Sequence, residues 1–195
     1  IAAYQPKGAA DYAASKVNLA NPGTYNAVDG AAYPTWNATS GWICNGINQY
    51  LKTGVVYLNT WSVLIRFSNV TSNGFYYLFG MNKDPNREIG IIPNRVGVGA
   101  RFLHYWPSQK STSFTSGVLG MAYLATYANG FEITGGDALR DFSGTPASDI
   151  WIGGLHTGGD AFSAGCASYI QAFAIYNTTL TAPQVAALSA AMAAL

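Results

Sequence analysis

Side chains that could perform acid–base chemistry are few in this chain and lie far apart in the sequence. Glu88 and Glu132 are the two glutamates, and neither has a second carboxylate two residues away, where a strand would place it on the same face. Asp84 precedes Glu88 by four residues, but a Pro-Asn turn separates them. Catalysis by paired carboxylates needs both groups next to one substrate bond. The spacing of these residues predicts no such pair.

The two histidines could supply a base for nucleophilic catalysis, but no Gly-x-Ser-x-Gly nucleophile motif accompanies them. His104 follows Leu103 in a β-rich run, and strand alternation predicts a partly exposed structural histidine there. His156 lies in the glycine-rich run 155–160. It is a candidate ligand-binding residue, and the alternative is an ordinary surface histidine.

Cys44 and Cys166 are the two cysteines, and without a CxxC pair they form no zinc-binding pattern. Both lie in expected strands that would be neighbours in a β-sandwich. A disulfide between them would contribute on the order of 4–5 kcal/mol in the chain-entropy model. The alternative is a pair of buried free thiols that behave as small apolar residues.

Short β-rich runs separated by turn residues must position these side chains. The main expected strands are 42–51, 61–68, 75–81, 88–92, 95–103, 118–124, 150–154 and 169–176. In the second run Val63, Ile65 and Phe67 alternate onto one face. Asn129-Gly130 between two alternating stretches predicts a two-residue hairpin, because both turn positions need a positive φ. Strands at this spacing favour a sandwich or jelly roll over βαβ units.

The two ends of the chain differ from this middle part. Thr181 followed by Gln184 is a capping box that starts a C-terminal helix. The helix carries an apolar stripe, expected to dock on the sandwich, of Val185, Leu188, Met192 and Leu195. Residues 1–40 are rich in helix and strand breakers, so we expect an irregular N-terminal extension or arm with one short helix within 9–17. Residues 41–195 are expected to form one domain.

Composition excludes several classes of protein. Hydrophobic residues make up 49% of the chain and charged residues 10%, which is the opposite of a disordered sequence. The formal net charge of +1 provides no basic field for nucleic acid. Because no run of about 18 apolar residues occurs, we expect no membrane insertion.

The sequence resembles the laminin-G-like, concanavalin A-like lectin/glucanase superfamily from Gly41 to the C-terminus. The segments that carry the resemblance are 42–51, 61–67, 127–130, 150–154 and 169–180, ahead of the closing helix. The segment 4–25 is similar to an extension on such domains in bacteriophage and metagenomic proteins. The resemblance implies an antiparallel, all-β jelly-roll sandwich with an N-terminal extension and a short C-terminal helix.

The resemblance also implies sugar recognition at rim loops. Exposed aromatic rings stack on the apolar side of pyranose rings, and the best placed aromatic residues are Trp36, Tyr105 and Trp106, with His156 as a further ligand-binding candidate. Trp42, Trp61 and Trp151 lie within expected strands and are assigned to the core. Many relatives hold calcium in rim loops, so Asp137, Asp141 and Asp160 are the candidate calcium ligands. Each of these aspartates could instead be a turn former.

Retaining glycosidases of this superfamily carry a Glu-x-Asp-x-Glu strand, and this chain has none, so we expect a protein that is not an enzyme. The function that follows is a non-catalytic lectin-like module, extracellular or on a virion surface, that binds a glycan or cell-surface polysaccharide. The alternative is a structural protein of a phage capsid or tail without sugar affinity. Its partners would be further virion subunits or other copies of the chain.

Overall fold

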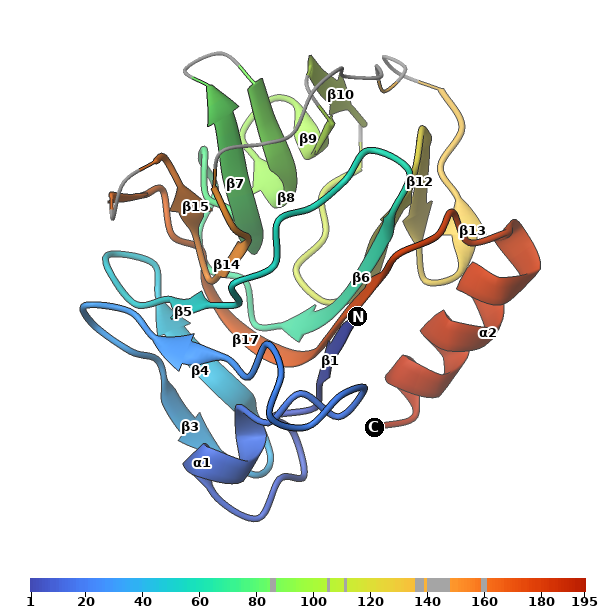
Figure 1. The fold of residues 1–195 in the computed structure, drawn as a ribbon. Helices are drawn as coiled ribbons and strands as arrows, with labels where there is room; N and C mark the ends of the chain where they lie inside the picture. Colours follow the sequence, from blue (N-terminus) through green and yellow to red (C-terminus); the bar gives the residue numbers. More distant parts are fainter. Residues whose placement is uncertain (85–86, 105, 111, 136–138, 140–147, 159–160) are drawn as a thin grey trace.

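The computed structural model describes residues 1–84, 87–104, 106–110, 112–135, 139, 148–158 and 161–195. Two antiparallel β-sheets make up most of the described chain, and a short helix, α2 (Ala182–Ala193), lies at its C-terminal end (Figure 1). The predicted all-β sandwich with a C-terminal helix is therefore confirmed. No helix among the described residues is long and apolar enough to cross a membrane.

Sheet A contains the long strand β17, which pairs with three others, β1, β4 and β6. In spatial order its strands are β13 (Phe131–Glu132), β12 (Ala125–Ala128), β11 (Gly117–Ala122), β6 (Ser62–Ser68), β17 (Ala167–Tyr176), β4 (Gly41–Asn45) and β3 (Thr35–Asn37), with β1 (Ala2–Tyr4) also paired to β17. The register between β17 and β6 shifts between Ile170 and Ala172. This bulge turns Ile170 toward the core between the sheets and Ala172 toward the outside, under α2.

Sheet B carries the surface on which the candidate site lies. In spatial order its strands are β10 (Trp106–Gln109), β9 (Gly99–His104), β8 (Arg87–Arg95), β7 (Phe79–Asp84), β14 (Trp151–Ile152), β5 (Leu51–Lys52) and β2 (Val28–Asp29). A hairpin of β15 (Leu155–His156) and β16 (Phe162–Ser163) joins it through a parallel pairing of β15 with β7. Sequence patterns predicted the β14 region but not this parallel return.

The main core lies between the two sheets. Val63, Ile65 and Phe67 of β6 are fully buried there, as their alternation predicts. Leu64 points to the other face of sheet A and packs in a second cluster with Leu180 and Val185. The apolar residues of β6 are thus buried on both of its faces, as a strand in the middle of a covered sheet requires.

Helix α2 closes the outer face of sheet A. The Gln184 side-chain Oε1 accepts from the Thr181 backbone N–H at 2.9 Å, which satisfies a donor that the first helical turn leaves open. Val185 and Met192 are buried against the sheet, and Leu188 and Leu195 pack beside them. The predicted capping and docking of this helix are both confirmed.

The Asn129-Gly130 hairpin is also confirmed. Asn129 has φ 50° and Gly130 φ 87°, and these residues connect β12 to β13. Both angles are positive, as a type I′ turn requires.

Residues 1–40 contribute strands to both sheets. The N-terminal ammonium of Ile1 donates to the Ile175 carbonyl at 3.0 Å, and β1 continues along β17. Strand β3 pairs with β4 in sheet A, and β2 pairs with β5 in sheet B. Helix α1 (Tyr12–Ser15) lies within the interval predicted for it, with Asp11 as N-cap. The segment predicted as an extension is thus hydrogen-bonded to the sandwich in this structure.

The prediction of a partly exposed His104 is wrong. Its side chain is fully buried, and its Nε2 lies 3.1 Å from the Asn59 carbonyl oxygen. The rings of Tyr57 and Tyr123 pack edge-on against it. Every residue of β9 is buried, so alternation along this strand does not separate a solvent face from a core face.

Candidate functional site

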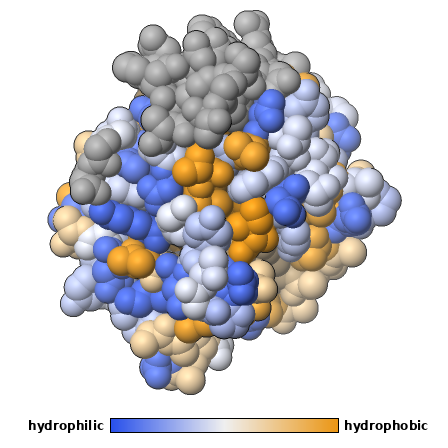
Figure 2. All heavy atoms as spheres, in the orientation of Figure 1, coloured by the Kyte–Doolittle hydropathy of each residue, from blue (hydrophilic) through white to orange (hydrophobic). Residues whose placement is uncertain are grey.

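The face of sheet B that points away from the core, here called the outer face, has a row of residues in register across five strands. Val28, Lys52, Trp151, Gly80 and Gly90 follow one another from β2 to β8. At the β2 end of this row an aromatic column and a polar groove lie next to each other. Figure 2 shows hydrophilic residues along the side of the molecule where β5 and β15 lie in Figure 1.

Four rings form the aromatic column. Trp151 stacks on His156 with centroids 3.9 Å apart and on Tyr50 at 4.2 Å, and Tyr50 stacks on Phe162 at 4.7 Å. A Cβ at Gly154 would lie 2.1 Å from the Phe162 ring, so glycine is required for the β15–β16 hairpin to close over the column. Trp151 is fully buried, as predicted, and the column forms a rigid wall beside the groove.

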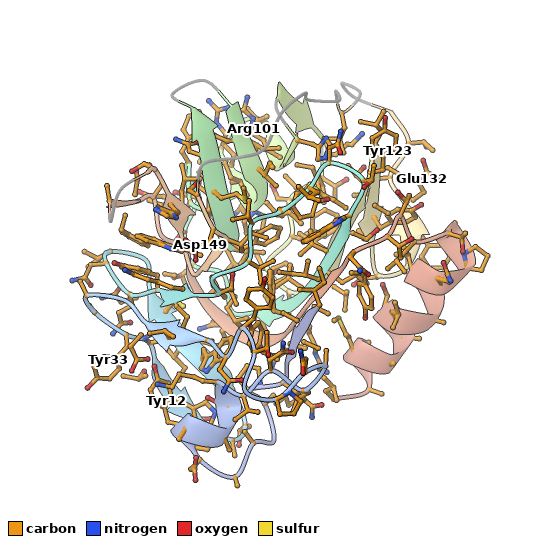
Figure 3. The ribbon with its side chains drawn as sticks, in the orientation of Figure 1. Tyr12, Tyr33, Arg101, Tyr123, Glu132 and Asp149 are labelled. Atoms are coloured by element: carbon orange, nitrogen blue, oxygen red, sulfur yellow. The ribbon has the colours of Figure 1, made fainter. Side chains whose placement is uncertain are left out.

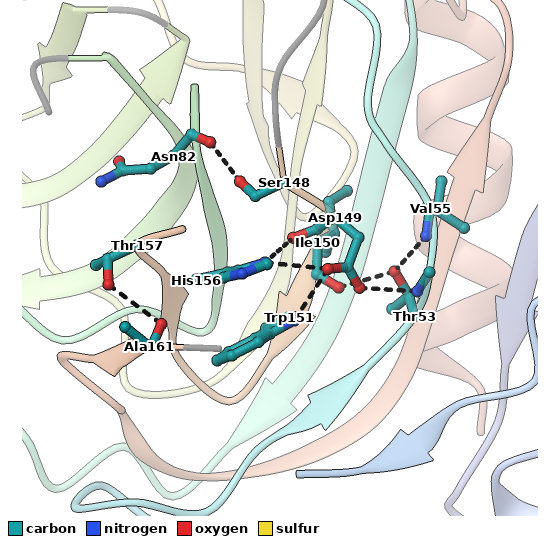
Figure 4. A network of polar contacts seen from close by, with 11 residues as sticks. Thr53, Val55, Asn82, Ser148, Asp149, Ile150, Trp151, His156, Thr157 and Ala161 are labelled. Atoms are coloured by element: carbon teal, nitrogen blue, oxygen red, sulfur yellow. Dashed lines mark hydrogen bonds and ion pairs between the residues drawn. The ribbon is translucent and has the colours of Figure 1, made fainter. Parts of the chain in front are cut away.

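Asp149, immediately before β14, connects the column to the neighbouring loop. Its Oδ1 accepts from the Trp151 indole N–H at 3.1 Å, and its Oδ2 accepts from the Gly54 backbone N–H at 2.9 Å (Figure 4). Thr53 Oγ1 donates to the Ile150 carbonyl at 2.8 Å and holds the same two segments together. The carboxylate is therefore fixed in position while about a fifth of its side chain stays exposed.

His156 faces the same carboxylate. Its Nδ1 lies 3.0 Å from both the backbone oxygen and the Oδ1 of Asp149. Both of these atoms are acceptors, so Nδ1 carries the proton, and a neutral ring has its lone pair on Nε2. The ring is almost completely buried against Trp151.

An open groove of about 750 Å³ lies over these residues. Its polar lining comes from Asn26, Lys52, Ser148, Asp149 and His156. Its rim carries Tyr25 and Val28, which are 45% and 59% exposed. The groove thus combines hydrogen-bond donors and acceptors with an accessible aromatic ring. Its volume lies within the range usual for small-molecule sites.

The residues predicted for ligand binding have different positions. His156 lines the groove. Trp36 lies in β3 of the other sheet, half-buried, and its indole N–H donates to the Pro6 carbonyl at 2.8 Å. Trp106 begins β10, but its side chain, like the whole of Tyr105, lies outside the described residues.

The candidate calcium ligands Asp137, Asp141 and Asp160 also lie outside the described residues, so calcium binding stays a prediction. Among the residues that are described, no group of three histidine, cysteine or acidic side chains could hold a metal ion. Asp29, at the end of β2, pairs with the Lys16 ammonium at 2.9 Å.

Cys44 and Cys166 are free, buried thiols in the structure. Ser168 lies opposite Cys44 in the β17–β4 ladder, so Cys166, two residues earlier, is diagonal to Cys44 on the same face. Burial, with a contribution from Cys166, raises the pKa of Cys44 to about 12, and burial raises the pKa of Cys166 to about 12. The disulfide therefore stays a prediction, on a pair of neighbouring thiols.

Sequence reasoning missed most of the groove. Lys52, Asn26 and Tyr25 carry no motif, and Asp149 is not among the residues singled out from the sequence. One signal was present: Asp149 and His156 flank a strand and a Gly153-Gly154 turn, which can bring the two side chains back together.

No protein-family model matches this chain, and no curated protein matches it in sequence. Solved structures do match its fold. Domain 4 of AbnA, a GH43 extracellular arabinanase from Geobacillus stearothermophilus in complex with arabinotriose, aligns with a TM-score of 0.60 and 21% identity over 96% of this chain and 97% of that one. Trypanosoma rangeli sialidase in complex with sialic acid aligns with a TM-score of 0.62 and 16% identity, over 94% of this chain. NanB sialidase from Streptococcus pneumoniae aligns with a TM-score of 0.53 and 12% identity, over 74% of this chain.

The chain spans 31% of the Trypanosoma rangeli sialidase chain and 26% of the NanB chain, but 97% of the arabinanase domain. At these identities the similarity shows a shared fold, that of β-sandwich domains in carbohydrate-active enzymes. The expectation that the protein is not an enzyme is overturned, because chains of this fold come from an arabinanase and from sialidases. A missing acidic strand motif does not exclude activity in such a fold. The laminin-G-like resemblance stays a prediction.

Proposed function

We propose that this chain binds carbohydrate in the groove of Asp149 and His156. The observation that carries the proposal is the fixed Asp149 carboxylate, whose two oxygens are oriented by Trp151 and Gly54 at the floor of an open groove. Sugar hydroxyls both donate and accept, so they suit a groove that offers a carboxylate beside ammonium, amide and hydroxyl groups. The shared fold with an arabinanase domain solved with arabinotriose supports the same class of ligand.

Each residue of the groove would make a different contact with the sugar. Asp149 accepts from one or two sugar hydroxyls, and each such charge-assisted bond is worth about 1.5–3 kcal/mol before ordering costs. Lys52 and Asn26, which also line the groove, donate to hydroxyl oxygens. Tyr25, on the rim, offers its ring to the apolar face of a sugar. The buried column holds Asp149 through the Trp151 indole N–H, so this carboxylate needs little further ordering on binding.

A glycan array with the full chain tests the proposal, run in calcium and again in EDTA to include the predicted metal. We expect binding to at least one saccharide, and loss of that signal by about tenfold or more in Asp149→Asn, because the charged acceptor is removed. Glu132→Gln is the matched control, since this carboxylate is exposed on β13 of the other sheet (Figure 3).

Chromatography of arabinotriose and of the bound saccharide after incubation with the protein determines whether binding leads to cleavage. A folded protein that binds no saccharide of the array would contradict the proposal. A defined oligomer in that sample would then favour the alternative of an assembly protein.

A further inference from the structure

Gln171 of β17 is a buried polar side chain without a partner. It is 8% exposed, and its side-chain amide makes no hydrogen bond to any residue that the structure describes. The register between β17 and β6 shifts between Ile170 and Ala172, so Gln171 is the extra residue of the bulge and has no cross-strand partner on β6. Buried polar side chains are nearly always hydrogen-bonded, so this amide indicates a place where water or a ligand supplies the missing bonds.

The Gln171 amide lines a hollow of about 290 Å³ on sheet A, beside the end of α2. Asn129 lies at the same hollow, and its Oδ1 accepts from the Val118 backbone N–H at 2.9 Å. This bond fixes the Asn129 amide and leaves its NH₂ group as a donor. The other polar residues that line the hollow are Arg66, Ser68 and Ser116.

A second hollow of about 250 Å³ adjoins the first, and Asn129 and Ala193 line both. It lies where the β12–β13 turn packs on α2, and its wall includes Ser189, which is 2% exposed. Phe131 also lines it, with 78% of the residue exposed. The two hollows together, here called the α2 groove, combine a buried unpaired amide with an exposed aromatic ring.

The charge of Arg66 is partly offset by α2. Its Nη1 donates to the Met192 carbonyl at the C-terminal end of the helix, where the backbone carries partial negative charge. None of the described residues that line the α2 groove is acidic. The groove therefore offers mainly neutral hydrogen-bonding groups, which fit a neutral ligand with several hydroxyls better than a polyanion.

We propose that the α2 groove is a second saccharide site, which binds a neutral sugar. The inference rests on the proposed function in that the ligand is a saccharide. Gln171 presents an N–H donor and a carbonyl acceptor side by side, a pair that two neighbouring hydroxyls of a sugar ring satisfy together. The exposed ring of Phe131 packs against the apolar face of the same saccharide.

The two saccharide sites lie on different sheets. Figure 1 shows α2 on the opposite side of the view from β5 and β15, which flank the groove of Asp149. One chain can therefore hold two saccharides, or two parts of one polysaccharide, at the same time. Because the α2 groove lacks a charged acceptor, we expect it to bind more weakly than the groove of Asp149.

The test is an NMR titration of the ¹⁵N-labelled full chain with neutral trisaccharides: arabinotriose, xylotriose, maltotriose and cellotriose. The reporters of the α2 groove are the Gln171 side-chain NH₂, identified by its absence in Gln171→Met, and the Gly130 backbone N–H. The Trp151 indole N–H reports on the groove of Asp149. With at least one trisaccharide we expect both sets of signals to shift, each set with its own affinity.

Variants separate direct contact from a transmitted change. Gln171→Met should weaken binding at the Gly130 reporter about fivefold or more, because the hydrogen bonds of the amide are lost. Phe131→Ala should weaken it about two- to tenfold through the lost ring contact. Gln5→Met and Tyr33→Ala, which change an exposed amide and an exposed ring elsewhere, are the matched controls and should leave it unchanged.

The two proposals fail in different ways. If the Trp151 signal saturates while the Gln171 and Gly130 signals stay unshifted with every trisaccharide at several millimolar, the hollows hold only water and the second site is wrong. If only the α2-groove signals shift, the second site stands and the groove of Asp149 is wrong. Shifts at Gly130 that vanish in Asp149→Asn, or that keep their affinity in folded Gln171→Met and Phe131→Ala, also overturn the second site.

Discussion

Asp149 connects three parts of the outer face of sheet B. Through its two oxygens it fixes the indole of Trp151, the backbone of Gly54 and the ring of His156. A carboxylate with this many donors is pre-organised, because it cannot rotate without breaking bonds inside the protein. It therefore needs little further ordering to accept a ligand hydroxyl.

Replacing Asp149 by Asn should also reduce stability, independently of binding. The amide has one acceptor oxygen, so the N–H of Gly54 or of Trp151 loses its partner, which costs about 1–3 kcal/mol. Urea unfolding measures this change. The exposed Glu132→Gln should stay within about 0.5 kcal/mol of wild type. Equal stability of the two variants would show that the network at Asp149 does not form in solution.

The two buried thiols predict a dependence on pH. Their folded pKa of about 12 lies above the ordinary value of 9.0, so the folded state keeps its protons longer than the unfolded one. The contribution of these two thiols to the free energy of unfolding is fully present below about pH 9 and is lost as the pH rises toward 12. Urea midpoints between pH 8 and 10 should fall less in the Cys44→Ala, Cys166→Ala double variant, and an unchanged slope would contradict the assignment.

Thiol labelling at pH 8 tests the same pair and the predicted disulfide. Ellman's reagent should react with neither cysteine in the folded protein and with both after denaturation, because thiolate is the reactive form. No reaction in denaturant would show that the two cysteines are bridged.

At the level of single residues, the sequence predicted burial better than function. Trp42 is buried in the core between the sheets, and Trp151 is buried as expected but in the aromatic column on the outer face of sheet B. His104 is buried because Tyr57 and Tyr123 cover a strand that alternation left half exposed. The contact between Asp149 and Gly54 joins residues 95 positions apart. Such a contact depends on how β5 and β14 pair, which no local pattern encodes.

Among the elements, the hairpin of β12 and β13 shows how local chemistry determines structure. Gly130 has φ +87°, and a Cβ there would lie 3.1 Å from the Cα of Ala186 in α2. The turn is thus both left-handed and in close contact with the helix, so this element and α2 are positioned together.

Gly130→Ala should destabilise the protein by more than the left-handed backbone alone explains, which is about 1–2 kcal/mol. Gly97→Ala is the matched control, because Gly97 has φ +72° and no described atom within 4 Å of an added Cβ. Chemical unfolding of both variants measures the contact with α2 as their difference. Equal losses would mean that α2 does not pack on the turn.

The elements predicted from sequence share strong local signals. The alternation in β6, the Asn-Gly turn and the Thr181–Gln184 capping box each involve neighbouring residues. The elements that were missed, such as the parallel pairing of β15 with β7 and the strands of residues 1–40, depend on partners far away in the sequence. These pairings gain their stability from tertiary packing, so periodicity cannot indicate them.

On the scale of the whole molecule, residues 1–40 belong to the sandwich. Tyr4 of β1 is almost completely buried, and its ring stacks on Phe173 at a centroid distance of 6.4 Å. A detachable arm would expose this ring. The segment also supplies Tyr25, Asn26 and Val28 to the groove, so the candidate site requires it.

Tyr4→Ala should therefore cost about 3–5 kcal/mol, as for other large aromatic residues removed from a core. Tyr33→Ala, at an exposed position of the same segment, is the control and should change the stability by less than about 0.5 kcal/mol. Thermal or urea unfolding gives both values. A small effect at Tyr4 would show that the N-terminal segment is a separate arm.

The measurement that tests the central claim most directly is an NMR titration of ¹⁵N-labelled protein with the saccharide that binds most strongly on the array. Asp149 holds two reporters, the Trp151 indole N–H and the Gly54 amide, at 3.1 and 2.9 Å. If carbohydrate binds in the groove, these two signals shift together and saturate with the same affinity. Shifts confined to sheet A and α2, with both reporters unchanged at saturation, would contradict the account.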